Sequence, residues 1–167
     1  QAQSLGPDVQ TTLLDEIIVT ATKRPETLFD VPVAVTAYTS EQLEAAQVRD
    51  VRDLQLIAPT LSVNSSTGST QTIFTIRGVG TPGQNTGLEQ SVGVFIDGVY
   101  RGRPGAALGD LVDIAQIEVL RGPQGTLFGR NTSGGVINVR TEAPSFTPMA
   151  RMEASVGDFD FRQVRGT

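Results

Sequence analysis

Two arginines stand in matching sequence contexts. Arg77 and Arg121 each follow a short apolar run and precede a glycine, so each is expected to place a cation at the end of a strand. A guanidinium group makes paired hydrogen bonds with a carboxylate, and it does so best where water is partly excluded. Taken alone, both are also compatible with ordinary solvated surface residues. The net charge of -5 and the lack of a basic stripe make nucleic acid an unexpected partner.

Side chains for catalysis are scarce in this sequence. The chain contains no histidine and no cysteine, which removes the commonest general base, the thiol nucleophile and any thiolate metal site. We expect ordinary roles for the acidic residues as turn, cap and surface groups, namely Asp97, Asp110, Asp113 and Glu118. A carboxylate pair of the glycosidase kind has no positive support. The sequence therefore predicts a protein that is not an enzyme, with no cofactor and no metal.

A glycine motif after one expected strand has the spacing of a dinucleotide site. Residues 78–83 read G-V-G-T-P-G, but Pro82 and the polar residues that follow continue as a loop, so no helix N-terminus would face a pyrophosphate. The stretch 125–133 likewise lacks the ending of a phosphate-binding loop. A small glycine-rich nucleotide-binding enzyme is therefore the weakest of the interpretations that we consider.

The apolar pattern predicts short strands and short helices separated by long loops. The Asp97-Gly98 pair predicts a two-residue hairpin between 92–96 and 99–101. Thr39 and Gln42 have the spacing of a capping box for a helix at 41–46. Further strands are expected at 32–38, 61–64, 72–77, 117–121 and 136–139, and further helical turns at 50–58 and 106–112. The predicted fold class is α+β, with a small mixed β-sheet.

The sequence between 116 and 140 has glycines at 122, 125, 129, 134 and 135, flanked by two β-prone runs. This stretch closely resembles the end of the plug domain of TonB-dependent outer-membrane receptors. Other landmarks of that family occur in the family's order over residues 15–145. They are a TonB box at Asp15–Ala21, a first Arg-Gly segment at Thr75–Gly80, a central hairpin at Val94–Tyr100 and a second Arg-Gly segment at Val119–Pro123.

The resemblance implies three parts of the chain. Residues 1–24 would be a flexible N-terminal tail with the TonB box, and residues 25–145 the plug. Residues 146–167 would be the truncated start of a transmembrane β-barrel, since 150–156 alternate in polarity as a first strand does. No apolar run reaches the roughly 18 residues of a membrane-spanning helix. The first residues fit a mature chain after signal-peptide removal.

The resemblance also implies partners. The box would add as a strand to the C-terminal domain of TonB through Asp15, Glu16, Ile17, Ile18, Val19, Thr20 and Ala21, although on composition alone a frayed terminal strand explains it as well. Arg77 and Arg121 would lock the plug to glutamates of its own barrel. The imported small molecule, such as a ferric chelate, would meet Thr81, Gly83, Gln84, Tyr100, Arg101 and Arg103.

The function expected from this resemblance is gating. The chain would be the plug of a receptor in the bacterial outer membrane that imports a scarce solute such as a ferric siderophore, with the barrel in contact with lipid and the tail facing the periplasm. Vitamins, sugars and aromatic acids are imported by similar receptors. The alternative is a free-standing periplasmic binding or adaptor module with a plug-like fold.

Overall fold

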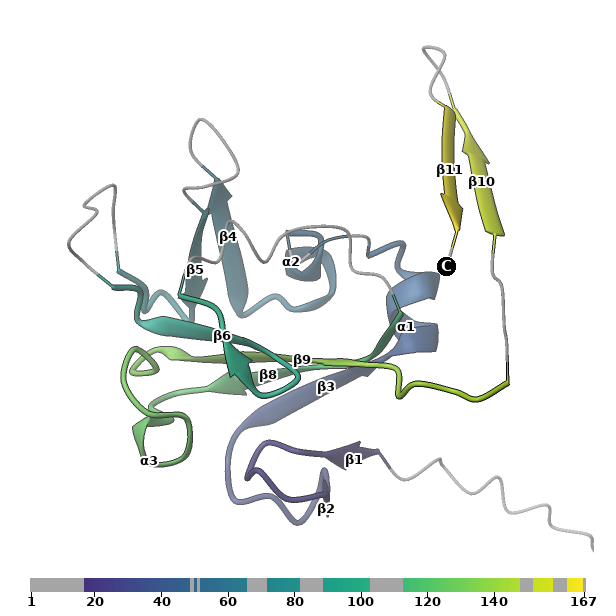
Figure 1. Cartoon of the computed structure of the whole chain (residues 1–167). Helices are drawn as coiled ribbons and strands as arrows, with labels where there is room; N and C mark the ends of the chain where they lie inside the picture. Colours follow the sequence, from purple (N-terminus) through teal and green to yellow (C-terminus); the bar gives the residue numbers. More distant parts are fainter. Residues whose placement is uncertain are drawn as a thin grey trace, which may run out of the picture.

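The computed structural model describes residues 17–48, 50, 52–65, 72–81, 89–102, 113–147, 152–157 and 162–166 (Figure 1). The helix expected at 106–112 lies outside these ranges. The elements are β1 Ile18–Val19, β2 Glu26–Thr27, β3 Val35–Thr39, α1 Ser40–Ala45, α2 Leu54–Ile57, β4 Leu61–Ser65, β5 Thr72–Ile76, β6 Val92–Ile96, β7 Val99–Tyr100, β8 Ile114–Arg121, α3 Gly125–Phe128, β9 Gly135–Thr141, β10 Met152–Val156 and β11 Arg162–Gly166.

The central feature is a five-stranded mixed sheet with the order β3-β8-β9-β6-β7. Strands β6 and β9 run parallel, with Val94 opposite Ile137, and the other neighbours are antiparallel. The antiparallel neighbours β6 and β7 are joined by a tight turn, whereas the parallel pair β6 and β9 is joined by a long crossover that includes β7 and β8. The predicted α+β class with a small mixed sheet is confirmed.

Both faces of this sheet are covered, by different parts of the chain (Figure 1). On one face lie α1, α2, β4 and β5, whose apolar side chains join Val94, Ile117 and Ile137 in one core cluster. On the other face lies the segment 17–33, which joins Leu120 and Val136 in a second cluster. Residues 116–120 of β8 are therefore all buried, and the side chains of Glu118 and Leu120 meet the N-terminal segment.

Two local predictions are confirmed in detail. Thr39 caps α1 with a capping box, in which its backbone N–H donates to Gln42 Oε1 at 3.2 Å. Asp97 and Gly98 form the turn between β6 and β7 with φ values of 49° and 78°, the left-handed values that a tight hairpin of this type requires. Asp97 also accepts from the Thr141 backbone N–H at 2.9 Å, which ties the turn to the end of β9.

A close backbone contact in the sheet explains one glycine. Gly135 has φ 144°, and a Cβ at this position would overlap the Leu120 carbonyl oxygen. Its partner across the ladder is Arg121, the last residue of β8. Any side chain here would push β9 away from β8, so this glycine permits the two strands to pair up to their ends.

Strands β10 and β11 form a separate antiparallel hairpin, with Met152 opposite Gly166. Met152, Ala154 and Val156 are exposed in the described part of the chain. The assignment of this segment to the first barrel strands remains a prediction. Among the described residues, no helix has the length and apolar character needed to cross a membrane.

Candidate functional site

The second half of the expected TonB box is packed against the sheet. Ile18 and Val19 form β1, which pairs with β2, and Val19 and Ala21 are fully buried. Ile18 points outward and is 49% exposed. Asp15 and Glu16 lie outside the described residues. The expected flexible tail through residue 24 therefore does not describe residues 17–24 in this structure, because Val19 and Ala21 complete the apolar cluster around Leu120 and Val136.

Glu118 holds this segment to the sheet, and its expected role as an ordinary surface, turn or cap residue is wrong. The residue is 0% exposed. Its Oε1 accepts from the Thr20 backbone N–H at 2.6 Å and from Thr20 Oγ1 at 3.0 Å. Hydrogen bonds to an ionised carboxylate are stronger than those between neutral groups. Glu118 thus joins residues 98 positions apart in the sequence.

Asn138 completes a small buried network around this carboxylate. It lies opposite Glu118 in the β8–β9 ladder and donates through Nδ2 to Glu118 Oε2 at 3.1 Å. The same nitrogen lies 3.2 Å from Thr20 Oγ1. Within the described residues no lysine or arginine forms a salt bridge with Glu118. A buried carboxylate without a cation depends on its hydrogen bonds, so Thr20 and Asn138 are its principal compensation.

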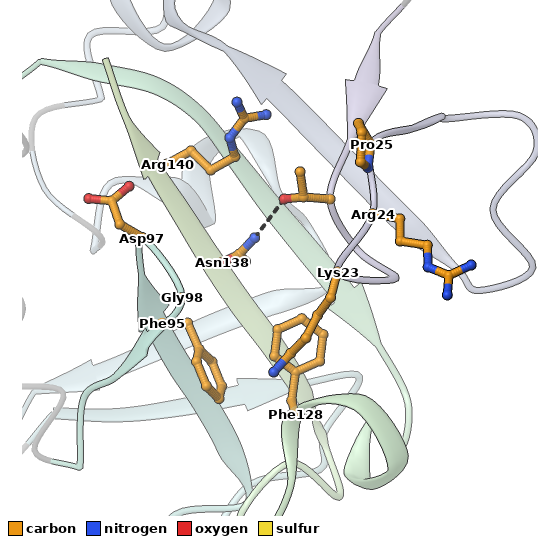
Figure 2. Close-up of a pocket in the computed structure, with 10 residues that line it drawn as sticks. Lys23, Arg24, Pro25, Phe95, Asp97, Gly98, Phe128, Asn138 and Arg140 are labelled. Carbon is orange, nitrogen blue, oxygen red and sulfur yellow. Dashed lines mark hydrogen bonds between the residues drawn. The ribbon is translucent and has the colours of Figure 1, made fainter. Parts of the chain in front are cut away.

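The network borders a hollow of about 360 Å³ (Figure 2). Thr20 and Asn138 are among the residues that line it. Phe95, Asp97 and Gly98 line it from β6 and its turn, and Lys23 and Arg24 line it from the segment after the box. The Lys23 ammonium lies 5.3 Å from the centre of the Phe128 ring. Solvent in this hollow is thus close to one side of a network that is otherwise buried.

The segments that carry the two arginines both lie near the start of β9. Arg77 is exposed and has φ 52°, in a turn closed by hydrogen bonds between Ile76 and Val79. Val79 lies near Gly134, and Ile76 lies near Gly135. Arg121 is the ladder partner of Gly135. The structure therefore brings the two Arg-Gly segments to one region through these two glycines.

Arg121 has a partner within the chain. Its Nε lies 3.4 Å from the Ala34 carbonyl oxygen, and its backbone N–H donates to the same oxygen at 2.9 Å. The expected lock of Arg121 to a barrel glutamate stays a prediction. Burial raises the pKa of the Tyr38 hydroxyl, and the positive charge of Arg121 partly opposes that rise. The described chain offers Arg121 no salt bridge.

The expected ligand residues are only partly within the described ranges, and Gly83, Gln84 and Arg103 lie outside them. Thr81 donates through Oγ1 to the Glu89 carbonyl oxygen at 3.2 Å. The Tyr100 hydroxyl accepts from Asn131 Nδ2 at 3.2 Å, and its ring lies 5.4 Å from that of Phe95. Arg101 is exposed at the end of the hairpin.

Sequence reasoning did not select Glu89, Asn131 or Arg130, which link these loops. Asn131 donates to the Glu89 carboxylate, and Arg130 forms a salt bridge with it at 3.7 Å. Thr81 contacts Glu89 directly, and Tyr100 is linked to Glu89 through Asn131, so both expected ligand residues are connected to Glu89. Of the described residues, no three histidine, cysteine or acidic side chains are grouped in a way that suits a metal ion.

Comparison with known families agrees with this architecture. Residues 27–136 match the model of the TonB-dependent Receptor Plug Domain. The match covers strands β3, β6, β7 and β8 of the five-stranded sheet and the first two residues of β9. The chain belongs to the family of TonB-dependent receptor plug domains.

Individual relatives are receptors and transporters. The chain is 30% identical over 156 residues to the pesticin receptor of Yersinia pestis, covering 92% of this chain and 23% of that protein. It is 32% identical over 134 residues to the vitamin B12 transporter BtuB of Vibrio vulnificus, covering 80% of this chain and 21% of the transporter. The solved ferric yersiniabactin uptake receptor FyuA of Yersinia pestis superposes with a TM-score of 0.70 at 30% identity, over 79% of this chain and 20% of that one.

The chain spans about a quarter or less of the length of these relatives. The segment that they share with it is the plug. The complex of FpvAI with pyocin S2 gives a similar superposition, with a TM-score of 0.69 at 21% identity, which establishes the fold.

Proposed function

We propose that this chain is the gating portion of a receptor in the bacterial outer membrane that imports a scarce solute with energy supplied through TonB. The relatives named as uptake receptors and vitamin transporters support this proposal. Its main structural support is the placement of the box. This short β-prone segment lies against one face of the five-stranded sheet through the buried Val19 and Ala21 and through hydrogen bonds of Thr20 with Glu118 and Asn138. It belongs to none of the ladders of that sheet, so it can leave without dismantling it.

The released box would bind the C-terminal domain of TonB by strand addition. In this mode the backbone of an extended segment pairs with an exposed sheet edge of the partner. In the docked form, β1 already pairs with β2 through Ile18 and Val19, and the Thr20 N–H is bound to Glu118. The same backbone groups cannot serve both partners, so docking on the plug and binding to TonB exclude each other.

The ferric siderophore class is the substrate that we propose. A ferric yersiniabactin uptake receptor and a ferripyoverdine receptor share the fold of this chain. The exposed Arg101, with Arg103 beyond the described residues, would attract an anionic chelate. Cells that depend on the complete receptor should grow on the ferric chelate as their sole iron source. If these cells instead need the receptor only to take up vitamin B12, the substrate class of the vitamin B12 transporters is favoured.

The test of the TonB step uses a peptide of residues 15–21. We expect it to bind the C-terminal domain of TonB in calorimetry, and we expect Ile18→Pro to weaken binding about tenfold or more, because proline removes a backbone donor and forbids the ladder. The matched control is Ile18→Val, which keeps the donor and should bind like the unmodified peptide. Equal affinity of the proline and valine peptides would contradict strand addition.

A free-standing periplasmic module remains the alternative function. A complete protein that lacks membrane strands would favour the module, and one with alternating strands and aromatic girdles would favour the receptor.

A further inference from the structure

We propose that Glu118 is the residue that retains the TonB box on the plug, so that its hydrogen bonds to Thr20 set how often the box is released. This inference rests on the proposed function only for the identity of the partner that captures the released box. The docking itself is a property of this chain and can be measured without TonB.

The first support is that Glu118 makes the only described polar side-chain contacts between residues 17–21 and the sheet besides those of Asn138. Glu118 accepts two hydrogen bonds from Thr20 and is fully buried. The remaining contacts of the box with the sheet are apolar, through Val19 and Ala21. Apolar contacts favour a covered face without fixing which residue lies over which, whereas the hydrogen bond from the Thr20 N–H to the Glu118 side chain fixes the position of Thr20 over β8.

The second support is the cost that release would leave behind. When Thr20 departs, the described network leaves Glu118 with Asn138 as its hydrogen-bond donor. A buried carboxylate that loses charge-assisted hydrogen bonds is destabilised until water replaces them. The bordering hollow, lined by Thr20 and Asn138, brings solvent close to this position (Figure 2). Release therefore has a barrier set by Glu118, and water in the hollow keeps the released state accessible.

The experiment measures exposure of the box through an introduced thiol. The chain has no cysteine, so Val19→Cys places a single small thiol at a fully buried position of β1. In the complete protein that carries this chain, the rate of maleimide labelling at position 19 reports opening of the box. Val94→Cys, buried in the cluster on the opposite face, reports opening of the sheet itself.

We expect Glu118→Gln to raise the labelling rate at position 19 about tenfold, since the neutral amide weakens the two hydrogen bonds from Thr20. Thr20→Val, which removes the hydroxyl and keeps the N–H, should raise it about threefold. Labelling at position 94 should not change in either variant. Two matched controls should label at the original rate. They are Glu142→Gln, which neutralises an exposed glutamate, and Thr147→Val, which removes the hydroxyl of an exposed threonine outside the box and its partner strand.

Unchanged labelling at position 19 in both variants would overturn the proposal. If Glu118→Gln raises labelling at both positions 19 and 94, that substitution has opened the sheet itself, and the result with Thr20→Val is used to judge the proposal. A rise confined to position 19 supports the proposal, and any other result with this variant overturns it. If the 15–21 peptide fails to bind TonB while Glu118→Gln still exposes the box, the proposed function fails and the retention of the box stands. If the peptide binds TonB while Glu118→Gln leaves the box unexposed, the proposed function stands and Glu118 does not retain the box.

Discussion

Glu118 and Arg121 lie on the same strand, β8, yet they differ in burial and in how many hydrogen bonds their side chains make within this chain. Glu118 is fully buried and accepts hydrogen bonds from Thr20 and Asn138, all within this chain. Arg121, at the end of β8, is only partly buried and its guanidinium bonds to one backbone carbonyl at 3.4 Å, and Arg77, in the turn after β5, is exposed. The plug therefore supplies the hydrogen-bond partners of the box from its own sheet. Among the described residues, by contrast, neither arginine of the pair forms a salt bridge. This difference predicts which substitutions affect the chain itself and which affect its assembly.

The largest effect on stability should come from removing the Glu118 carboxylate. Glu118→Ala leaves the Thr20 N–H and the Asn138 amide without their acceptor and opens a space in the second core cluster, so we expect a loss of roughly 3 kcal/mol in the free energy of unfolding. Urea denaturation of the purified chain measures this loss. Glu142→Ala, at an exposed position, should change stability by less than about 0.5 kcal/mol. Equal stability of the two variants would show that Glu118 is not an anchor.

Stability should also fall, by about 1 kcal/mol or more, when Gly98 is replaced by valine. Valine strongly disfavours the φ of 78° that this turn requires. The Asp97 carboxylate would then lose its position beside Thr141, and β9, which carries Asn138, would lose that tie at its end. The control is Gly102→Val, at an exposed position where an added Cβ lies 3.5 Å from the Tyr100 ring, an ordinary contact. Thermal denaturation that fails to separate the two variants would contradict the role of the turn.

The Gly98 turn and the buried Glu118 differ in how well the sequence predicts them. The Asp97-Gly98 turn and the Thr39 capping box depend on residues within a few positions of one another, so spacing alone predicts them. The buried state of Glu118 depends on Thr20, which is 98 positions away, and on the fact that β8 is covered on both faces. An acidic residue inside an apolar alternation was the available signal. The parallel pairing of β6 with β9 is likewise set by tertiary contacts that no local pattern encodes.

The candidate site was predicted in the same uneven way. The resemblance selected the box, both arginines and the hairpin from short motifs, and the structure brings the two arginine turns together through Gly134 and Gly135. The docking of residues 17–24 was not predicted. Their composition is that of a mobile tail, and their burial is favourable because Val19 and Ala21 pack against the apolar face formed by Leu120 and Val136.

The smallest effect on the chain itself should come from the arginine pair, and this prediction tests the comparison most directly. Charge reversal of both, with Arg77→Glu and Arg121→Glu, should change the unfolding free energy of the isolated chain by less than about 0.5 kcal/mol, because neither guanidinium forms a described salt bridge. In the complete receptor, the same pair should loosen the plug. We propose that carboxylates of the barrel wall face these two arginines, and a carboxylate that faces a new carboxylate loses its partner and gains repulsion.

Leakage should therefore rise in the receptor while the stability of the chain hardly changes. Conductance in planar bilayers and entry of a large antibiotic into cells both measure the leak. The matched control is the double substitution to lysine, which keeps the charge but loses the paired geometry of guanidinium, and we expect an intermediate leak from it. If the glutamate variant closes the receptor as well as the arginines do, both side chains are ordinary solvated residues. If it destabilises the isolated chain as much as Glu118→Ala does, the distinction between internal and external partners on β8 is wrong.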